Sequence, residues 1–253
     1  NFYISNYKKL LINTHFYMTS LIFLNTKTKP NMQTQYSLDL NQFKLQGKIE
    51  DGPFGGVYQA KENNTGKIFI AKVYNQQIEE ESYTKSFKSL INKSKSISNF
   101  DHPSIAKFIG FSPVNFQGER KPVTITEYTA NKTLEDILQS QKNRIEDKNW
   151  NDTRKLIILY SIASAMSALH SQNIIHSHLK PSNIIIDAKS NPKVTDYFLS
   201  KSSFAKNSTN GNRNTILYLP PEAINSSKYT KEGDIYSFAM IAYRMFSHEE
   251  PFD

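Results

Sequence analysis

The sequence predicts an α+β fold of two lobes, and two features of its pattern carry this prediction. Strand-like segments with one helix-like segment fill the chain before residue 130, whereas the part after it reads as mostly helical. The change falls near residues 127–131, where we place the linker. A strand-rich lobe followed by a helical lobe leaves a cleft between the two, which is where small-molecule sites tend to lie.

Short strands are predicted where apolar, β-branched runs are bounded by glycine and asparagine turns. The expected strands are residues 43–50, 56–62, 67–74, 106–113 and 123–128. Residues 83–99 carry apolar side chains at helix-like spacing, so we expect one helix there, although its serine and asparagine content makes it a poor helix former.

The second half is predicted to be helical, with helices at residues 133–140, 152–171 and 231–246 and a small strand pair at 184–186 and 193–195. In the long helix 152–171 we expect one apolar face. This face is predicted to consist of Leu156, Leu159, Tyr160, Ala163, Met166 and Leu169.

Composition indicates a globular protein and excludes several functions. The chain has 253 residues, 38% hydrophobic and 21% charged, which is enough for one substantial core or two small ones. It carries a net charge of +8, but the lysines are scattered and are not interleaved with aromatic residues, so no nucleic-acid partner is expected. The absence of cysteine excludes disulfides, thiolate catalysis and cysteine-ligated metals.

Residues 1–37 are expected to be an extension, either disordered or lying upstream of a start at Met32. Residues 8–24 faintly resemble a signal sequence, because two lysines precede an apolar stretch. That stretch is interrupted by polar residues and is too short to span a bilayer, so no membrane association is expected.

Glycines at residues 52 and 55 form a candidate phosphate loop between two predicted strands. Without a Cβ, Gly52 and Gly55 would let backbone N–H groups approach phosphate oxygens, although a plain hairpin turn would use the same residues. Lys72 follows in the middle of an apolar strand, where it needs an anionic partner if it points inward. The alternative is an edge-strand lysine that faces water.

The run IIHSHLKPSNIIID at residues 174–187 resembles the catalytic loop of protein kinases, H-R-D-L-K-P-x-N followed by an apolar strand. Other family markers follow in order. Residues 193–200 resemble the approach to D-F-G, residues 215–222 the segment closing on A-P-E, and residues 234–239 the helix beneath the catalytic loop. We identify the chain as similar to eukaryotic-type protein kinases of the Ser/Thr or tyrosine-kinase-like groups.

The resemblance implies a bilobal kinase fold and a site for ATP and Mg²⁺. The first lobe, residues 38–130, would hold a five-stranded antiparallel sheet with one helix, and the mainly helical second lobe, residues 131–253, would end after its large helix. The implied nucleotide-binding residues are Gly52, Gly55, Val57, Ile70, Lys72, Thr126, Glu127, Thr129 and Ile185. Asn183 and Asp196 would bind Mg²⁺, Lys180 would neutralise the γ-phosphate, and Asp234 would anchor the catalytic loop.

Departures from the family pattern affect the catalytic step. His178 stands where the catalytic aspartate would accept the substrate proton, and Glu50 replaces the first loop glycine. No acidic residue lies between Ser82 and Phe100 to pair with Lys72, unless the run at residues 79–81 belongs to a shifted helix. In addition, Phe198 replaces the glycine of D-F-G and Ser177 the loop arginine. If the lobe ends after its large helix, as we expect, Glu222 would lack the arginine that the family's last helices supply.

Three functions are compatible with this sequence. The first is a cytoplasmic pseudokinase that binds ATP and acts through unidentified protein partners. This interpretation is favoured because the sequence retains the nucleotide-binding residues but lacks the aspartate that serves as the catalytic base. The second is a weakly active Ser/Thr kinase that uses His178 or substrate positioning alone. The third is a degenerate gene fragment without a stable function.

Overall fold

The computed structural model describes residues 37–52, 55–75, 97, 101–129, 132–143, 150–187, 189–197, 216–226 and 228–252. Residues Leu38–Asp253 form one unit, so the sheet and the helical part are considered together below. The predicted extension, apart from its last residue, and the predicted helix at 83–99, apart from Ile97, lie outside the described residues.

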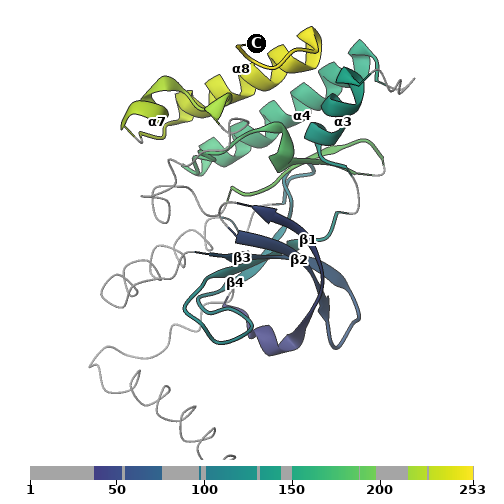
Figure 1. Cartoon of the computed structure of the whole chain (residues 1–253), viewed down its shortest axis with the longest axis vertical. Coiled ribbons are helices and arrows are strands. Elements are labelled where there is room, and N and C mark those ends of the chain that lie inside the picture. The colour runs from purple at the N-terminus through teal and green to yellow at the C-terminus, as the bar shows by residue number, and fades with distance from the viewer. Residues whose placement is uncertain are drawn as a thin grey trace, which may run out of the picture. The chain divides into compact units, whose positions relative to one another are not determined.

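A five-stranded antiparallel sheet opens this unit, as the sequence predicts (Figure 1). Its strands are β1 (Phe43–Gly52), β2 (Gly55–Glu62), β3 (Ile68–Tyr74), β4 (Phe108–Ser112) and β5 (Val123–Glu127). Their order in the sheet is β1-β2-β3-β5-β4, so β3 is a central strand paired on both sides. Lys72 is therefore held in register between Val57 of β2 and Thr124 of β5, which excludes the edge-strand alternative.

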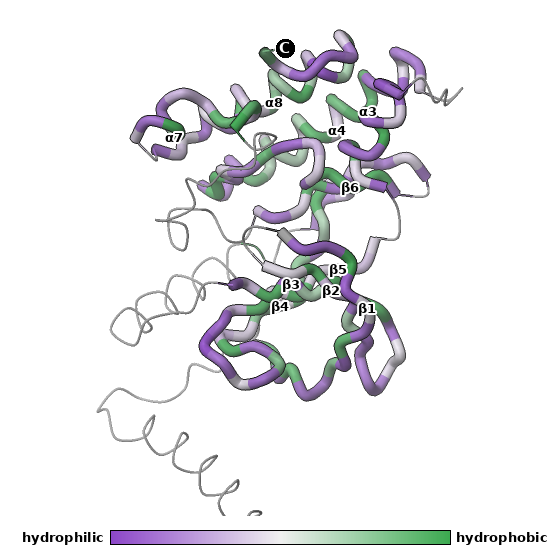
Figure 2. Tube along the Cα trace, in the orientation of Figure 1, coloured by the Kyte–Doolittle hydropathy of each residue, from purple (hydrophilic) through white to green (hydrophobic). Residues whose placement is uncertain are grey.

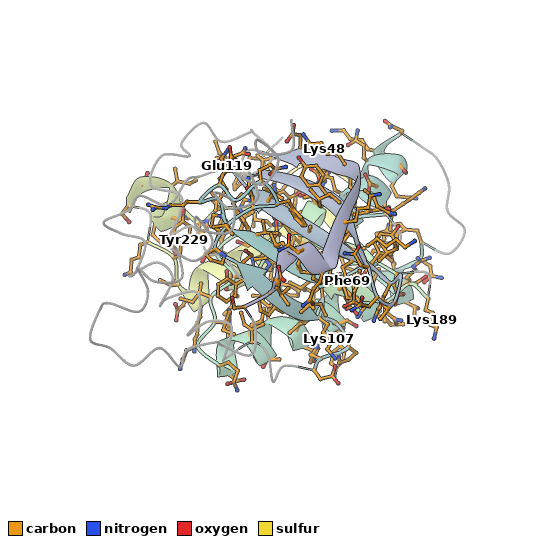
Figure 3. The ribbon with its side chains drawn as sticks, turned by 90° about the horizontal axis from the view of Figure 1, so that it is seen from below. Lys48, Phe69, Lys107, Glu119, Lys189 and Tyr229 are labelled. Carbon is orange, nitrogen blue, oxygen red and sulfur yellow. The ribbon has the colours of Figure 1, made fainter. Side chains whose placement is uncertain are left out.

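Alternation along the strands builds the core of this sheet. Successive strand residues point to opposite faces, and the buried set on one face includes Phe43, Phe69 and Ile125. The Phe43 and Phe69 rings meet edge to face at 5.8 Å, a favourable aromatic geometry. Figure 3 shows Phe69 against the sheet, while Lys48 and Lys189 lie at the outside.

The second part is mostly helical, as predicted. Its elements are α3 (Leu134–Lys142), α4 (Asp152–Ser171), the 3₁₀ turn η2 (Pro181–Asn183), β6 (Ile184–Ile186), β7 (Pro192–Val194), α7 (Pro221–Ser226) and α8 (Lys231–Ser247). Side-chain caps fix three helix starts. Thr133 and Asp136 form a capping box on α3, the Asn151 side chain accepts from Arg154 N at 2.9 Å on α4, and Thr230 accepts from Gly233 N at 3.0 Å on α8.

Most of the residues that we predicted for the packed apolar face of α4 are not buried, so this prediction was wrong. Leu156 and Tyr160 are 58% and 77% exposed, whereas the helix buries Ile158, Ile162 and Ala165 together with Met166 and Leu169. Apolar side chains lie on both sides of this helix, so spacing alone does not identify the packed face. Figure 2 shows hydrophobic colouring along α4 and α8, which contact each other. Within the described residues, no helix is both long and apolar enough to cross a membrane.

Candidate functional site

A cavity of about 270 Å³ lies between the sheet and the β6–β7 region. It collects the site residues that the sequence predicts, with the exception of Gly52. Those that line it are Gly55, Val57, Ile70, Lys72, Thr126, Glu127, Thr129, His178, Lys180, Asn183, Ile185 and Asp196. Its volume is just below the range of about 300–1,000 Å³ that is usual for small-molecule sites.

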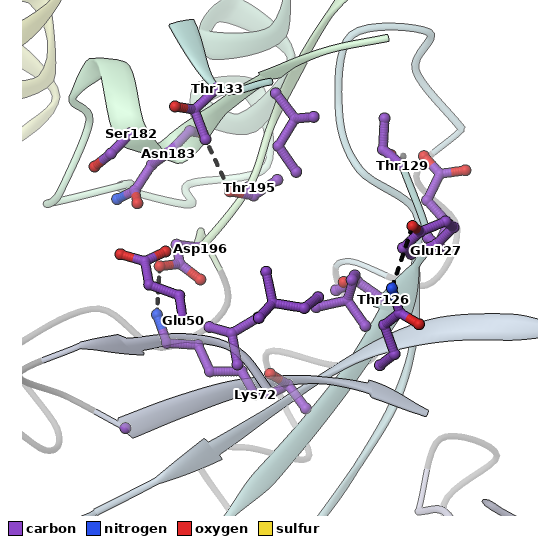
Figure 4. Close-up of a pocket in the computed structure, with 18 of the residues that line it drawn as sticks. Glu50, Lys72, Thr126, Glu127, Thr129, Thr133, Ser182, Asn183, Thr195 and Asp196 are labelled. Carbon is purple, nitrogen blue, oxygen red and sulfur yellow. Dashed lines mark hydrogen bonds and ion pairs between the residues drawn. The ribbon is translucent and has the colours of Figure 1, made fainter. Parts of the chain in front are cut away.

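Lys72 and Asp196 form an ion pair at one end of this cavity (Figure 4). Their side chains are only 16% and 25% exposed. Burial alone lowers the pKa of Lys72, but the Asp196 carboxylate outweighs it and the pKa is raised. Burial likewise raises the pKa of Asp196, and the charge and hydrogen bond of Lys72 reverse this, so that the pKa falls below its ordinary value. Asp196, which follows β7, is therefore the anionic partner that an inward-pointing Lys72 was predicted to need.

Backbone hydrogen bonds to Asp234 hold the segment before His178 in place. The carboxylate of Asp234, in the first turn of α8, accepts from the N–H groups of His176 and Ser177, each at 2.8 Å. A third hydrogen bond, also 2.8 Å, joins it to His170 Nε2 at the end of α4. Ser177 is held at a φ of 66°, a conformation that L residues rarely adopt without such constraints. These contacts confirm the prediction that Asp234 anchors this loop.

His176 connects this loop to the segment after β7 that carries Asp196. Its Nδ1 accepts from His178 N at 3.2 Å, and its Nε2 bonds the carbonyl oxygen of Thr195 at 2.8 Å. The first contact makes Nδ1 the acceptor, so Nε2 carries the proton and donates. Complete burial lowers the pKa of His176, which favours this neutral form.

Asn183 completes the loop and faces the same end of the cavity. Its amide nitrogen donates to the His178 carbonyl at 2.7 Å, so its amide oxygen is the atom suited to a cation. Thr195 N in turn donates to the Asn183 carbonyl at 2.9 Å, which ties Asn183 to the residue before Asp196. Burial lowers the pKa of Lys180 nearby. Two cations, one carboxylate and one amide oxygen therefore converge here.

The opposite end of the cavity is apolar and bordered by Glu127. Val57 and Ile70 come from the sheet and Ile185 from β6, so aliphatic side chains line the cavity from both of its walls. The Glu127 carboxylate accepts from Lys107 N at 3.0 Å and pairs with Lys193 Nζ at 2.6 Å. These contacts fix the segment joining the two parts, with Thr126, Glu127 and Thr129 together at this end (Figure 4).

Gly55 is required for packing, whatever it binds. At its φ of 149°, a methyl group would overlap the carbonyl oxygen of Val73 and lie 2.8 Å from Tyr74 Cα. β2 and β3 approach each other so closely at this point that no Cβ fits. Gly55 also lines the cavity, so its backbone is available to a ligand.

Sequence reasoning missed several cavity residues, among them Ile49, Gln59, Tyr128, Thr133, Ser182 and Thr195. Gln59 could have been found, because it lies two residues after Val57 on a strand and so shares its face. No pattern in the neighbouring sequence marks Thr133 as a site residue, because an isolated antiparallel β-bridge to Ile185 brings it to the cavity. Phe198 and the acidic run at residues 79–81 lie outside the described residues.

Comparison with known proteins decides the family, because residues 43–253 match the protein kinase domain. This chain belongs to the protein kinase family. It is 29% identical over 218 residues to Aurora kinase of Saccharomyces cerevisiae, covering 86% of this chain and 56% of the relative. It is also 29% identical over 214 residues to cysteine-rich receptor-like protein kinase 22 of Arabidopsis thaliana, covering 82% and 30%. A probable serine/threonine-protein kinase of Dictyostelium discoideum is 27% identical over 235 residues, covering 91% and 17%. The chain thus spans about half or less of these relatives.

Members of the kinase family typically use ATP with Mg²⁺, and the described residues fit both groups. Asp196 and Asn183 offer oxygen donors, which hard cations prefer. Lys72 and Lys180 lie at the same end and suit phosphate oxygens. Among the described residues, no cluster of three or more His, Cys, Asp or Glu side chains that could hold a metal ion occurs.

Proposed function

We propose that this kinase domain is a pseudokinase that binds ATP with Mg²⁺ and acts through protein partners. The observation that carries the proposal is the composition of one cavity, which assembles Lys72, Asn183 and Asp196 together with His178, the residue that the sequence resemblance aligns with the proton acceptor. A bound ATP would supply a transferable phosphoryl group, with Mg²⁺ neutralising its charge.

Each part of the cavity has a distinct role in this proposal. Val57, Ile70 and Ile185 would hold the base between aliphatic surfaces, and Lys72 would bind phosphate oxygens while Asp196 and Asn183 hold the cation. In the described state Asp196 neutralises Lys72 directly. Ligand binding therefore exchanges one anionic partner of Lys72 for another, so that no buried charge is left unpaired.

Nucleotide binding to the purified chain tests the proposal. We expect saturable, Mg²⁺-dependent binding by calorimetry, and at a nucleotide concentration of 100 Kd a stabilisation of about 2.7 kcal/mol against unfolding. Lys72→Ala should abolish binding, whereas Lys44→Ala, which removes an exposed lysine of the same sheet, should leave it unchanged. A folded wild-type chain that binds neither ATP nor ADP would sink the proposal.

A weakly active Ser/Thr kinase is the second candidate, favoured by one observation. His178 and Lys180 both line the cavity, so an imidazole lies in the same cavity as the proposed phosphate-binding residues. A neutral imidazole can accept a proton, although a carboxylate also orients the hydroxyl. Phosphotransfer by wild type that His178→Asp does not increase would favour this candidate. Activity that appears only in His178→Asp would favour the pseudokinase.

A further inference from the structure

Glu50 brings a second carboxylate to the phosphate end of the cavity. It lies near the end of β1, paired in register with Val57 of β2, and it lines the cavity with Lys72 and Lys180. Figure 4 shows Glu50 gathered with Lys72 and Asp196, away from Thr126 and Glu127. Its charge acts on both lysines, favouring the protonated form of each.

The charges at this end are balanced without any ligand. Two lysines, Lys72 and Lys180, face two carboxylates, Glu50 and Asp196. Asp196 is paired with Lys72 and also acts on Lys180, and Glu50 adds a further negative charge that acts on both lysines. Glu127 lines the other end and is paired with Lys193. A polyphosphate chain entering here is attracted by Lys72 and Lys180 and repelled by the Glu50 carboxylate, which reduces its net attraction to this end of the cavity.

We propose that Glu50 determines which nucleotides this cavity accepts, by removing the advantage of a highly charged phosphate tail. The inference rests on the proposed nucleotide site. It assigns the cavity a ligand class in which adenosine and ADP bind at least as well as ATP. Glu50 neighbours Val57 but lies away from Thr126 and Glu127, so recognition of the nucleoside is retained while the preference for the triphosphate is lost.

The size of the effect follows from the exposure of Glu50. More than a third of this residue is exposed, so water screens its charge and the effective dielectric constant is high. Removing one such charge several ångströms from a phosphate is expected to tighten ATP binding about three- to tenfold. Adenosine has no phosphate, so its affinity should change less than about twofold on the same grounds.

Calorimetric titration of adenosine, ADP and ATP in Mg²⁺ tests the proposal on wild type, Glu50→Gln and Glu50→Lys. Asp51→Asn is the matched control, because it removes one negative charge from the next residue of β1, whose exposed side chain pairs with Lys48 and does not line the cavity. Each titration is repeated at low and high salt, since an electrostatic effect across water must shrink as ionic strength rises.

Tighter ATP binding in Glu50→Gln, still tighter binding in Glu50→Lys, unchanged adenosine binding and a silent Asp51→Asn are the expected results. Saturable adenosine binding with no selective gain for ATP in either variant would overturn the role of Glu50 and leave the nucleotide site standing. If no variant binds adenosine, ADP or ATP, both this inference and the proposed function are overturned.

Discussion

Replacing Asp234 with alanine removes the acceptor that holds the loop before His178. The Asp234 carboxylate is 2% exposed and accepts two backbone hydrogen bonds, from His176 N and Ser177 N, each at 2.8 Å. His176 is fully buried and Ser177 is 6% exposed, so water cannot easily replace the lost acceptor. Asp234→Ala therefore leaves two buried N–H donors without partners.

The expected cost follows from these two donors. A buried donor left unsatisfied costs about 1–3 kcal/mol, and a carboxylate in the first turn of a helix adds about 0.3–1 kcal/mol of favourable dipole interaction. Relief of the desolvation of the Asp234 carboxylate and relaxation of the loop toward water offset part of this loss. We expect Asp234→Ala to lower the free energy of unfolding by about 3–5 kcal/mol, a large share of the 5–15 kcal/mol typical of domains.

Urea unfolding followed by circular dichroism measures this loss, with Asp234→Asn and Asp152→Ala beside it. The asparagine variant keeps one acceptor oxygen and should lose about half as much. Asp152 also lies in the first turn of a helix, but its side chain is 78% exposed and contacts the buried Lys155 at 3.3 Å, so its removal should cost about 1–2 kcal/mol, less than Asp234→Ala. Equal, small losses for Asp234→Ala and Asp152→Ala would refute the assignment of Asp234 as the anchor.

Three further predictions concern stability and use the same unfolding assay. Arg244→Met should cost about 3 kcal/mol, because the buried guanidinium pairs in a bidentate manner with Glu135 at 2.7 and 2.8 Å, and a cost below about 1 kcal/mol would contradict this. Burial lowers the pKa of His176, so below about pH 6.5 the unfolded chain takes up a proton that the folded chain does not. Stability should therefore fall between pH 7 and pH 5, by at most about 1.4 kcal/mol per pH unit for this group, and a rise would contradict the assignment. Gly55→Ala should be strongly destabilising, because the added Cβ would overlap the backbone of β3. Gly47→Ala should have little effect, because no atom lies within 4 Å of a Cβ added there. Similar losses of stability in the two variants would exclude the packing explanation.

The arrangement of strands and helices was largely predictable, because strong local patterns determine it. Apolar runs bounded by turn residues placed all five strands within a few residues of their observed ends, and helix α4 was predicted with its observed bounds. The face that α4 packs was not predictable in the same way. The apolar side chains of α4 are spread around the whole helix. Ile158 is buried and Tyr160 is exposed because of the elements that pack against the helix, and these cannot be read from the local sequence.

The cavity was predictable where a motif fixes the residue and unpredictable where tertiary contacts do. Motif spacing brought Lys72, Asn183 and Asp196 to one site, yet the pairing of Lys72 with Asp196 joins residues 124 positions apart. Likewise, the pairing of Glu127 with Lys193 joins residues 66 positions apart and depends on how β5 and β7 meet. Such pairs have no local pattern, because each partner alone is compatible with an exposed charge.

Backbone hydrogen bonds of residue 178 and of the two residues before it hold the loop at this position. Residue 178 takes part through its backbone, since its N–H donates to His176 Nδ1 and its carbonyl accepts from Asn183 Nδ2. The remaining constraints come from Asp234, whose hydrogen bonds go to the two residues before it. We therefore expect exchange of histidine and aspartate at 178 to change proton acceptance and substrate orientation more than the backbone that presents Asn183 and Asp196. Substitution at this position thus tests the proposed loss of chemistry separately from the proposed nucleotide binding, because the contacts of Asn183 and Asp196 with Thr195 and Lys72 do not involve the side chain at 178.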